Sequence, residues 1–334
     1  MEKINIEIRN PKSIDGFNNW DFVRIATVLG NRSLFEWKNI SFPEKTDVIR
    51  LLKLNGISPL NRFDQNYLNT IKNNSIRSLI NLGFDNLDYE MLRTKNIDEI
   101  LFMLGRPDLK SGESLCPFAK ILHVVHRMEA RTLKNISAIS DERLSGFLNR
   151  KILGSVERMI ECGYPITNIY GGIKSYQSQL AKMIAKTDGF SHPIFDKFRF
   201  RIIVKDLSDI PVLLCGLFDN VIPVNCYLSG QTVNSLFPIE SLFEKSLNFN
   251  EDSFFKQQDN DKVVSPVNRS SSAGYKTLNF IADLPVKIHN LGTIFVLCEF
   301  QIIDEKTRKI NSQGDNSHSE YKSRQLKRIR SRLS

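Results

Sequence analysis

Two acidic side chains stand inside otherwise apolar, strand-like runs in the second half of the chain. Asp196 lies near the start of IFDKFRFRIIV (194–204), and Glu299 lies within TIFVLCEFQIID (293–304), two residues before Gln301. Strand alternation in the first run places Asp196 on the face of Phe198 and Phe200, and places Lys197, Arg199 and Arg201 on the other face. Burying a carboxylate among apolar residues is costly unless a metal or a cation partner offsets its charge. If they converge, Asp196 and Glu299 could hold Mg²⁺ while phosphate oxygens supply the other ligands. A buried ion pair, or a capping role for Asp196, is the alternative.

A lysine and a tyrosine occupy positions from which they could contact a phosphate and a base. Lys174 follows a strand-like run and two glycines, Gly171 and Gly172, which let backbone approach a ligand closely. Tyr275 follows Gly274 at a predicted junction between a loop and a strand, where its ring could stack on a base. A surface lysine in a turn and a core tyrosine are the structural alternatives.

The elements that must position these residues form two groups along the chain. Residues 1–150 have helical periodicity, and helices are predicted at Tyr67–Leu82, Asn96–Leu104, Pro117–Leu133 and Asp141–Cys162. After Gly163, strands are predicted at Thr167–Ile173, Phe198–Val204, Val221–Leu228, Leu278–His289 and Thr293–Ile303. Further helices are predicted at Tyr176–Lys186, Ser208–Phe218 and Val233–Ser246. The predicted class is α+β, with a helical domain (1–150), a mixed-sheet domain (151–334) and a polar, flexible insertion near 248–272.

Composition limits the class of protein. The 334 residues are 41% hydrophobic and 25% charged, which is enough to bury a substantial core. The most apolar runs, such as Ile210–Phe218, are far shorter than the roughly 20 residues that span a bilayer, and no leader-like start is apparent. The five cysteines are scattered without a CxxC pair, so we expect reduced thiols and a cytoplasmic location.

Basic residues exceed acidic residues by nine, and much of the excess lies in the last fifteen residues, which carry six Lys or Arg and one Glu. Such a tail could meet the phosphates of a nucleotide or of RNA. A solvated helix end is the alternative.

A histidine pair offers a different candidate site. His123, His126 and Glu129 are spaced by three within ILHVVHRMEAR, so they share one face of a predicted helix and could begin a metal site. No further ligand is identifiable in the sequence, and packing or surface roles are the alternative.

The order of the blocks in the second half resembles the synthetase domain of the RelA/SpoT family, over roughly residues 150–334. Members of that family have a nucleotidyltransferase-like fold and transfer pyrophosphate from ATP to the 3′-hydroxyl of a guanine nucleotide. The resemblance therefore implies ATP and a guanine nucleotide as partners and Mg²⁺ as cofactor.

Five family motifs carry this resemblance, the last of them a final helix that resembles the stretch around His318, Glu320 and Tyr321. The Gly-Arg-x-Lys-Ser-like loop and its helix resemble 171–175 followed by Ser178, Lys182 and Met183, and the Asp-x-x-x-x-Arg strand start resembles 196–201. The Asn-Gly-Tyr-x-Ser segment, whose tyrosine stacks on guanine, resembles 273–277, and the Glu-x-Gln strand resembles 299–301. The resemblance implies catalytic roles for Asp196, Glu299 and Gln301, nucleotide binding by Lys174, Ser178, Lys182, Arg201, Tyr275 and Lys276, and magnesium binding by Asp196 and Glu299.

The chain also departs from the family pattern. Gly172 stands where the family has an arginine that packs on adenine, Asn279 stands in place of a histidine, and Ile303 in place of an arginine. No His-Asp dipeptide occurs, so the hydrolase domain of the long family members is not recognisable. The alternatives are a catalytically degenerate module that binds a nucleotide or RNA, or a transferase that modifies tRNA or a protein.

Overall fold

The computed structural model describes residues 6–32, 40–106, 114–185, 197–243, 274–288, 291–316 and 318–333. Within these ranges a series of helices is followed by a five-stranded sheet, which confirms the predicted α+β class. Asp196 and the predicted insertion at 248–272 lie outside the described residues.

Several helices of the first half begin after a residue whose side chain accepts hydrogen bonds from the first turn. They are α1 (Asn19–Leu29), α2 (Lys45–Leu54), α3 (Arg62–Asn81), α4 (Tyr89–Thr94), α5 (Ile97–Leu104), α7 (Cys116–Ile136) and α8 (Asp141–Glu161). Asn61 caps α3 and Ser140 caps α8, each accepting from backbone N–H groups. The four helices predicted here are confirmed, with α3 starting at Arg62 rather than Tyr67 because Asn61 supplies its cap.

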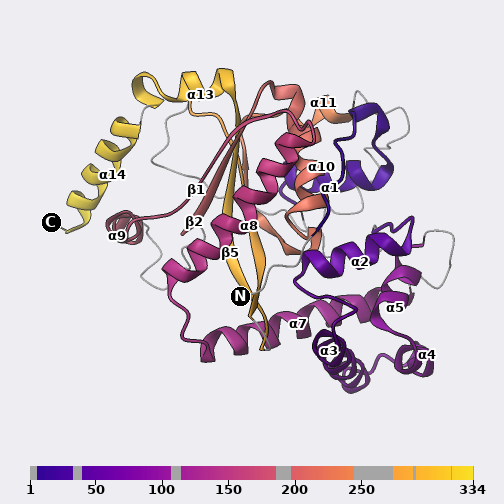
Figure 1. The fold of residues 1–334 in the computed structure, drawn as a ribbon. Helices are drawn as coiled ribbons and strands as arrows, with labels where there is room; N and C mark the ends of the chain where they lie inside the picture. Colours follow the sequence, from indigo (N-terminus) through magenta and orange to yellow (C-terminus); the bar gives the residue numbers. More distant parts are fainter. Residues whose placement is uncertain are drawn as a thin grey trace.

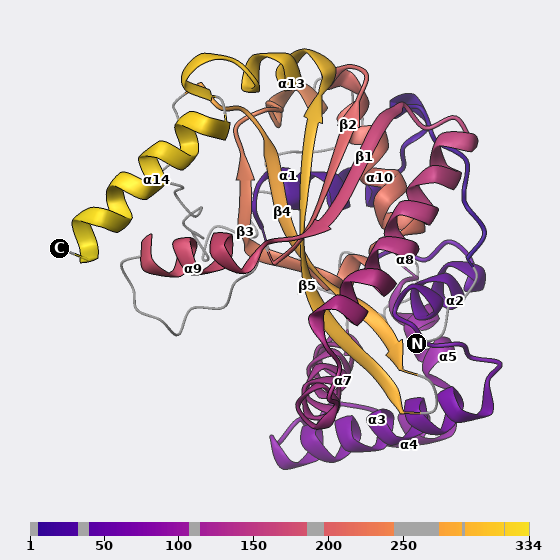
Figure 2. The ribbon, with the colours of Figure 1, turned by 60° about the vertical axis from the view of Figure 1, so that its left-hand side comes forward.

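The sheet is mixed, as predicted. Its strands are β1 (Ile166–Ile173), β2 (Phe198–Val204), β3 (Tyr227–Asn234), β4 (Leu278–Ile288) and β5 (Gly292–Asp304), in the order β1-β2-β5-β4-β3. The central pair, β2 and β5, is parallel, and every other neighbouring pair is antiparallel. Figure 2 shows the five strands fanned out, with the ends of β4 and β5 reaching down to α7.

Two predicted elements of the second half are wrong. Most of the predicted strand Val221–Leu228 is a buried turn that contains a 3₁₀ helix at Val224–Cys226, and only its last two residues belong to β3. The predicted helix Val233–Ser246 is also wrong, because β3 continues to Asn234 and pairs there with β4. In the described part of that segment, up to residue 243, the short α11 (Glu240–Phe243) is the helix that follows.

The remaining helices surround the sheet. They are α9 (Tyr176–Ala185), α10 (Ile210–Asn220), α13 (Glu305–Asn311) and α14 (His318–Leu333). In Figure 1 α13 lies above the strands, while α9 and α14 lie together at the left, and these two helices pack against each other. No described helix combines the length and the apolar character that crossing a bilayer requires.

Aromatic rings fill one face of the sheet. Phe200, Phe300 and Phe280, from β2, β5 and β4, are fully buried and stack in sequence, with ring centroids 5.7 Å and 5.3 Å apart. Asn149 of α8 lies so close to Gly171 of β1 that a side chain at this glycine would collide with it. The helix α8 therefore covers this apolar face.

The helix α7 packs against the distal half of the opposite face. The ring of His126 lies 5.1 Å from that of Phe295 on β5, and the guanidinium of Arg127 lies 4.7 Å from the same ring. Arg127 also forms an ion pair with Asp283 on β4. Helices of the first half thus contact the sheet directly, and the boundary near residue 150 stays a prediction.

Candidate functional site

Strand register places four polar residues on one face of the sheet, and three of them are predicted site residues. Phe198 and Phe200 point into the core, so the alternate residues Arg199 and Arg201 point to the opposite face, as the sequence pattern predicts. In the parallel pair of β2 and β5, Arg199 lies opposite Glu299 and Arg201 lies opposite Gln301. The predicted residues Glu299, Gln301 and Arg201 are therefore brought together.

Glu299 has a cation partner of its own. Its carboxylate forms an ion pair with Nε of Arg199, and its side chain is 12% exposed against 39% for the arginine. The ion pair that the sequence left open for a strand carboxylate is present at Glu299. The described residues contain no group of three or more His, Cys, Asp or Glu side chains that could together hold a metal ion.

The next rung of the sheet holds a chain of hydrogen bonds that reaches the predicted stacking tyrosine. Nε of Arg201 donates to Oε1 of Gln301 at 2.6 Å, and Nε2 of Gln301 donates to the hydroxyl of Tyr275 at 3.0 Å. Gln301 is only 4% exposed, so packing fixes its amide. The tyrosine hydroxyl is therefore held to the same face as Arg201 and Glu299, although Tyr275 belongs to the loop before β4.

The helix α13 holds that loop in place. The backbone N–H of Lys276 donates to the side chain of Asn311 at 3.2 Å, and the amide of Asn311 donates back to the carbonyl of Lys276 at 2.7 Å. Asn311 is buried and Lys276 is exposed. The reciprocal pair fixes the backbone between Tyr275 and β4, while the lysine side chain points to solvent.

A second group of predicted residues lies at the start of α9. The N–H of Lys174 donates to the carbonyl of Lys197 at 2.8 Å, which ties the loop after β1 to the start of β2. The hydroxyls of Ser175 and Ser178 are 3.0 Å apart, and Nζ of Lys322 on α14 donates to Ser178 at 3.3 Å. Ser178 thus connects α9 to the C-terminal helix. The side chain of Lys182 lies outside the described part of α9.

The histidine candidate does not form a metal site among the described residues. Nε2 of His123 accepts from Arg127 at 3.0 Å, and its Nδ1 lies 3.4 Å from the amide of Asn225. His126 is buried between the rings of Tyr67 and Phe295. Burial, with the nearby Arg127, lowers the pKa of His123 to about 3 and that of His126 to about 4, so both rings are neutral at pH 7. The described contacts of His123 and His126 are packing contacts and hydrogen bonds within the protein, which was the alternative that the sequence left open.

Sequence reasoning missed two residues of this region. Arg199 was placed on the correct face, but its pairing with Glu299 depends on the register between strands 100 residues apart. Asn311 gives no sequence signal, because its contact with the tyrosine loop arises only from the position of α13. Pairing between distant segments is the information that a single sequence does not supply.

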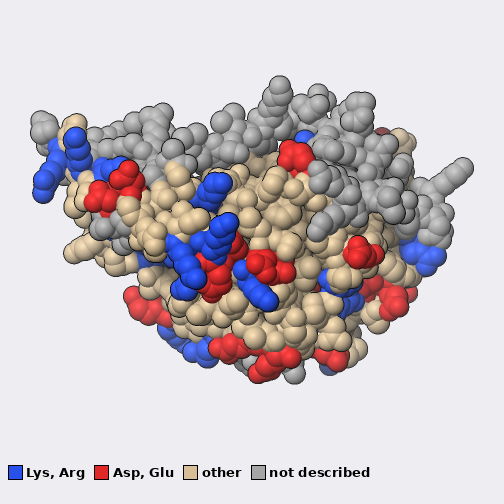
Figure 3. Space-filling view, turned by 90° about the horizontal axis from the view of Figure 1, so that it is seen from above, with Lys and Arg blue, Asp and Glu red and all other residues tan. Residues whose placement is uncertain are grey.

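The cationic tail forms most of α14, which packs on α9. Gln325 and Ile329 are buried, whereas Lys327 and Arg330 are exposed. Seen from above (Figure 3), basic and acidic side chains are interspersed over the visible described surface, with a basic group at the end where α14 lies. RNA binding by this tail stays a prediction.

Comparison with known proteins gives only distant likenesses. No family model and no curated protein matches the chain. It is similar to small alarmone synthetase 1 from Bacillus subtilis bound to its product pppGpp, with a TM-score of 0.36, 16% identity, and 57% of this chain and 85% of that chain covered. It is also similar to smu.1046c from Streptococcus mutans UA159, with a TM-score of 0.33, 17% identity, and 57% and 86% covered. A third likeness is to a GTP pyrophosphokinase family protein from Streptococcus pneumoniae, with a TM-score of 0.29, 16% identity, and 58% and 89% covered. Similarities with TM-scores this low do not support a functional assignment, so the candidate site rests only on contacts within this chain.

Proposed function

We propose that this protein transfers pyrophosphate from ATP to the 3′-hydroxyl of a guanine nucleotide or a related acceptor. The observation that supports this most directly is the hydrogen-bond chain from Arg201 through Gln301 to Tyr275, beside the pair of Arg199 and Glu299. It sets a guanidinium, an amide and an aromatic ring on one face, which are the groups that a phosphate, a ribose hydroxyl and a base require.

The proposal includes a magnesium ion as cofactor. Mg²⁺ is usually held by one or two carboxylates together with substrate phosphates, so Glu299 could serve as one ligand and Asp196 as the second. When bound, the ion would neutralise charge on the phosphates of the donor. Because Arg199 pairs with Glu299, it would orient the carboxylate.

The remaining residues have positioning roles in this proposal. Arg201 would balance phosphate charge, and its hydrogen bond to Gln301 would hold the guanidinium in one orientation. The fixed hydroxyl of Tyr275 would hold its ring in one orientation for stacking on the acceptor base. Glu299 or Gln301 would orient the attacking hydroxyl. Rate enhancement would come mainly from alignment and from charge stabilisation in this prearranged site.

Product formation tests the proposal. The purified protein is incubated with Mg²⁺, γ-labelled ATP and GMP, GDP or GTP, and labelled products are separated by chromatography. We expect a labelled guanosine product from the wild type and none from Asp196→Asn or Glu299→Gln, with unchanged circular dichroism in both variants. Full activity in Glu299→Gln would contradict the proposed role, and no product with any acceptor would favour the second candidate below.

Gly172 provides a gain-of-function test. It pairs with Arg199 in the sheet, and a Cβ there meets no described atom within 4 Å, so a longer side chain has room. If the missing family arginine limits ATP binding, Gly172→Arg should lower the KM for ATP. Gly154→Arg on α8 is a matched control, because Gly154 is equally open and lies on a helix away from this rung. An equal effect of both variants would show that added charge, not position, is responsible.

A nucleotide-binding module without transferase activity is the second candidate. The pairing of Glu299 with Arg199 favours it, because the carboxylate is then compensated without a metal. This function requires that a guanine nucleotide binds equally well in EDTA and in Mg²⁺, and that Tyr275→Ala abolishes binding. If RNA is the ligand instead, deletion of residues 321–334 should remove a salt-dependent affinity.

A further inference from the structure

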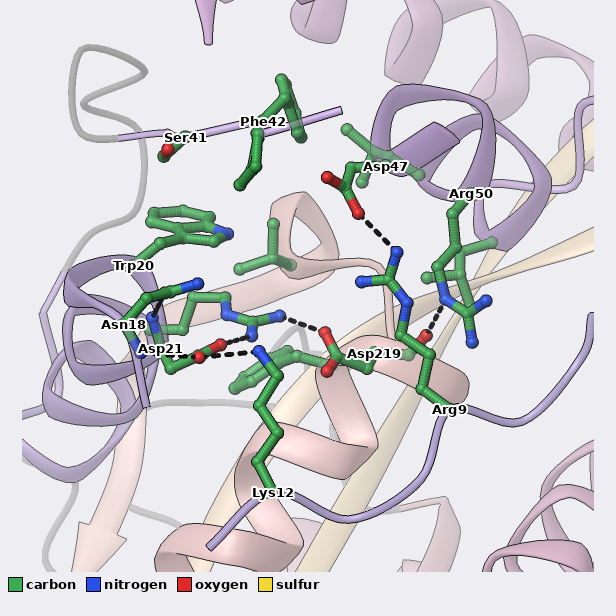
Figure 4. A pocket seen from close by; sticks show the side chains of 16 residues that line it. Arg9, Lys12, Asn18, Trp20, Asp21, Ser41, Phe42, Asp47, Arg50 and Asp219 are labelled. Carbon is green, nitrogen blue, oxygen red and sulfur yellow. Dashed lines mark hydrogen bonds and ion pairs between the residues drawn. The ribbon is translucent and has the colours of Figure 1, made fainter. Parts of the chain in front are cut away.

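A polar cavity lies apart from the residues of the proposed transferase site. It has a volume of about 140 Å³ and is formed by the N-terminal segment, α1, α2, the segment 41–43 and α10. Figure 4 shows Arg9 and Lys12 entering it from the N-terminal segment and Asp219 from α10. None of the residues assigned to the proposed transferase site lines this cavity.

Cations outnumber carboxylates in the lining. Four basic residues, Arg9, Lys12, Arg24 and Arg50, face three acidic ones. Each carboxylate is already paired: Asp47 with Arg9, Asp21 with both Lys12 and Arg24, and Asp219 with Arg24. Arg50 instead donates to neutral oxygens, among them the carbonyl of Asp219 at 2.7 Å and the side chain of Asn220 at 2.7 Å. Four basic and three acidic residues give the lining a net charge of +1.

Two arginines of the cavity are in unfavourable environments that a bound anion would improve. Nε of Arg24 is buried and has no hydrogen-bond partner among the described residues, and the side chain is 6% exposed. A buried N–H donor without an acceptor is costly. Burial, together with the neighbouring Arg9, lowers the pKa of Arg50. Two guanidinium groups that repel each other at one cavity form an electrostatic environment suited to an anion.

We propose that this cavity binds a phosphate group through Arg9, Lys12 and Arg24, with Arg50 contributing charge. Guanidinium forks match the tetrahedral oxygens of phosphate, and a charge-assisted bond to the unpaired Nε of Arg24 would satisfy a buried donor. The volume is several times the ~30 Å³ share of one water molecule. It is also below the roughly 300 Å³ at which pockets for larger ligands begin, so inorganic phosphate or a small phosphomonoester fits best.

Occupancy of this cavity would join segments that are distant in the chain. Arg9 and Lys12 belong to the N-terminal segment, whose backbone accepts from Tyr164 and donates to Asn220. Arg24 links α1 to α10 through Asp219. A bound phosphate would therefore bridge the N-terminal segment, α1 and α10, and would stabilise the whole fold in a concentration-dependent way. This inference does not depend on the transferase proposal.

Trp20 supplies a direct signal for the test. Its ring lies 5.7 Å from the guanidinium carbon of Arg24, and Trp37 is the other tryptophan of the chain. In a Trp37→Phe background, inorganic phosphate is titrated into the full chain at constant ionic strength, with chloride as the control anion. Fluorescence and the thermal midpoint are both recorded. A parallel titration with glycerol 3-phosphate distinguishes a free ion from an ester, since the tighter of the two identifies the source.

The variants Arg9→Gln and Lys12→Gln test the contacts. Both side chains are more than a third exposed, and Asp21 keeps Arg24 as a partner when Lys12 is changed, so both variants should fold. We expect saturable phosphate binding that weakens tenfold or more in each variant, and less than twofold in the exposed control Arg308→Gln on α13. A response to phosphate that does not saturate, or an affinity that is the same in all three variants, would overturn the assignment.

Discussion

The buried ion pair between Lys287 and Asp64 provides a quantitative test of how the helical half packs on the sheet. Lys287 lies on β4 and Asp64 in the first turn of α3, and their side chains are 5% and 3% exposed. Asp64 also accepts from the N–H of Ser58 at 2.7 Å. The pair connects residues 223 positions apart, so its strength reports directly on the contact between the two halves of the chain.

Removing one partner leaves a charge buried without compensation. For a pair this buried, the cost is about 3–5 kcal/mol. We therefore expect Lys287→Met, which keeps most of the side-chain volume, to lower the unfolding free energy by that amount. A chain of this size loses roughly 2 °C in Tm for each kcal/mol, so the midpoint should fall by roughly 6–10 °C. Asp64→Asn should cost a similar amount, because it leaves the lysine unpaired while retaining an acceptor for Ser58.

The double variant tests whether the two losses of stability are coupled. Lys287→Met with Asp64→Asn contains no buried charge at this position, so it should be more stable than the sum of the single losses by about 2 kcal/mol or more. Urea unfolding followed by circular dichroism gives all four free energies of the cycle. The exposed pair of Arg308 and Glu305 is the control, and Arg308→Gln should leave the midpoint almost unchanged. Strictly additive losses, or a loss below about 1 kcal/mol for Lys287→Met, would refute the packing described for α3 and β4.

Three further predictions follow from other parts of the structure. Because the folded pKa values of His123 and His126, about 3 and about 4, lie below the ordinary 6.5, stability should be constant above pH 6.5. It should then fall between pH 6.5 and 4 by about 1.4 kcal/mol per unit for each histidine, and urea titrations should show a shallower fall in His126→Phe. Gln301→Leu removes the link between Arg201 and Tyr275 and should weaken guanine nucleotide binding about tenfold by calorimetry, or 1.4 kcal/mol; unchanged affinity would count against the ring's orienting contact. In Gly216→Ala the new Cβ would overlap the ring of Tyr164, so the variant should lose about 1–3 kcal/mol, whereas Gly154→Ala, with open space, should not be destabilised.

Local pattern predicted the strands that carry the candidate site. The run FRFRIIV alternates large apolar and cationic residues, and its predicted bounds, Phe198–Val204, are those of β2. The position of Glu299 and Gln301 on a neighbouring strand was also predictable, because an apolar run of that length is typical of a central strand. Which residue meets Glu299 was not predictable, since register between β2 and β5 is set by the whole sheet.

The two wrong elements have physical causes. The run at 221–226 is mostly buried and apolar, as a central strand would be, but Pro223 directs it into a 3₁₀ turn instead. The segment that forms β3, YLSGQTVN, contains Ser, Gly and Gln and lacks clear alternation, and Gly230 there has a positive φ of 78°. An edge strand with a register shift against β4 therefore resembled a loop leading into a helix.

The parallel pairing of β2 with β5 affects when the candidate site can exist during synthesis. Closing a loop of 100 residues, the separation of Arg199 and Glu299, costs about 4 kcal/mol in chain entropy, whereas β4 and β5 are close neighbours in sequence. On the ribosome, β1 and β2 therefore emerge long before the strand that completes the sheet between them and β4. Until residue 304 has left the exit tunnel, Arg199 and Arg201 have neither Glu299 nor Gln301 opposite them. A nascent chain, or one truncated before β5, would lack Glu299 and Gln301, so the proposed chemistry would require a chain that includes β5.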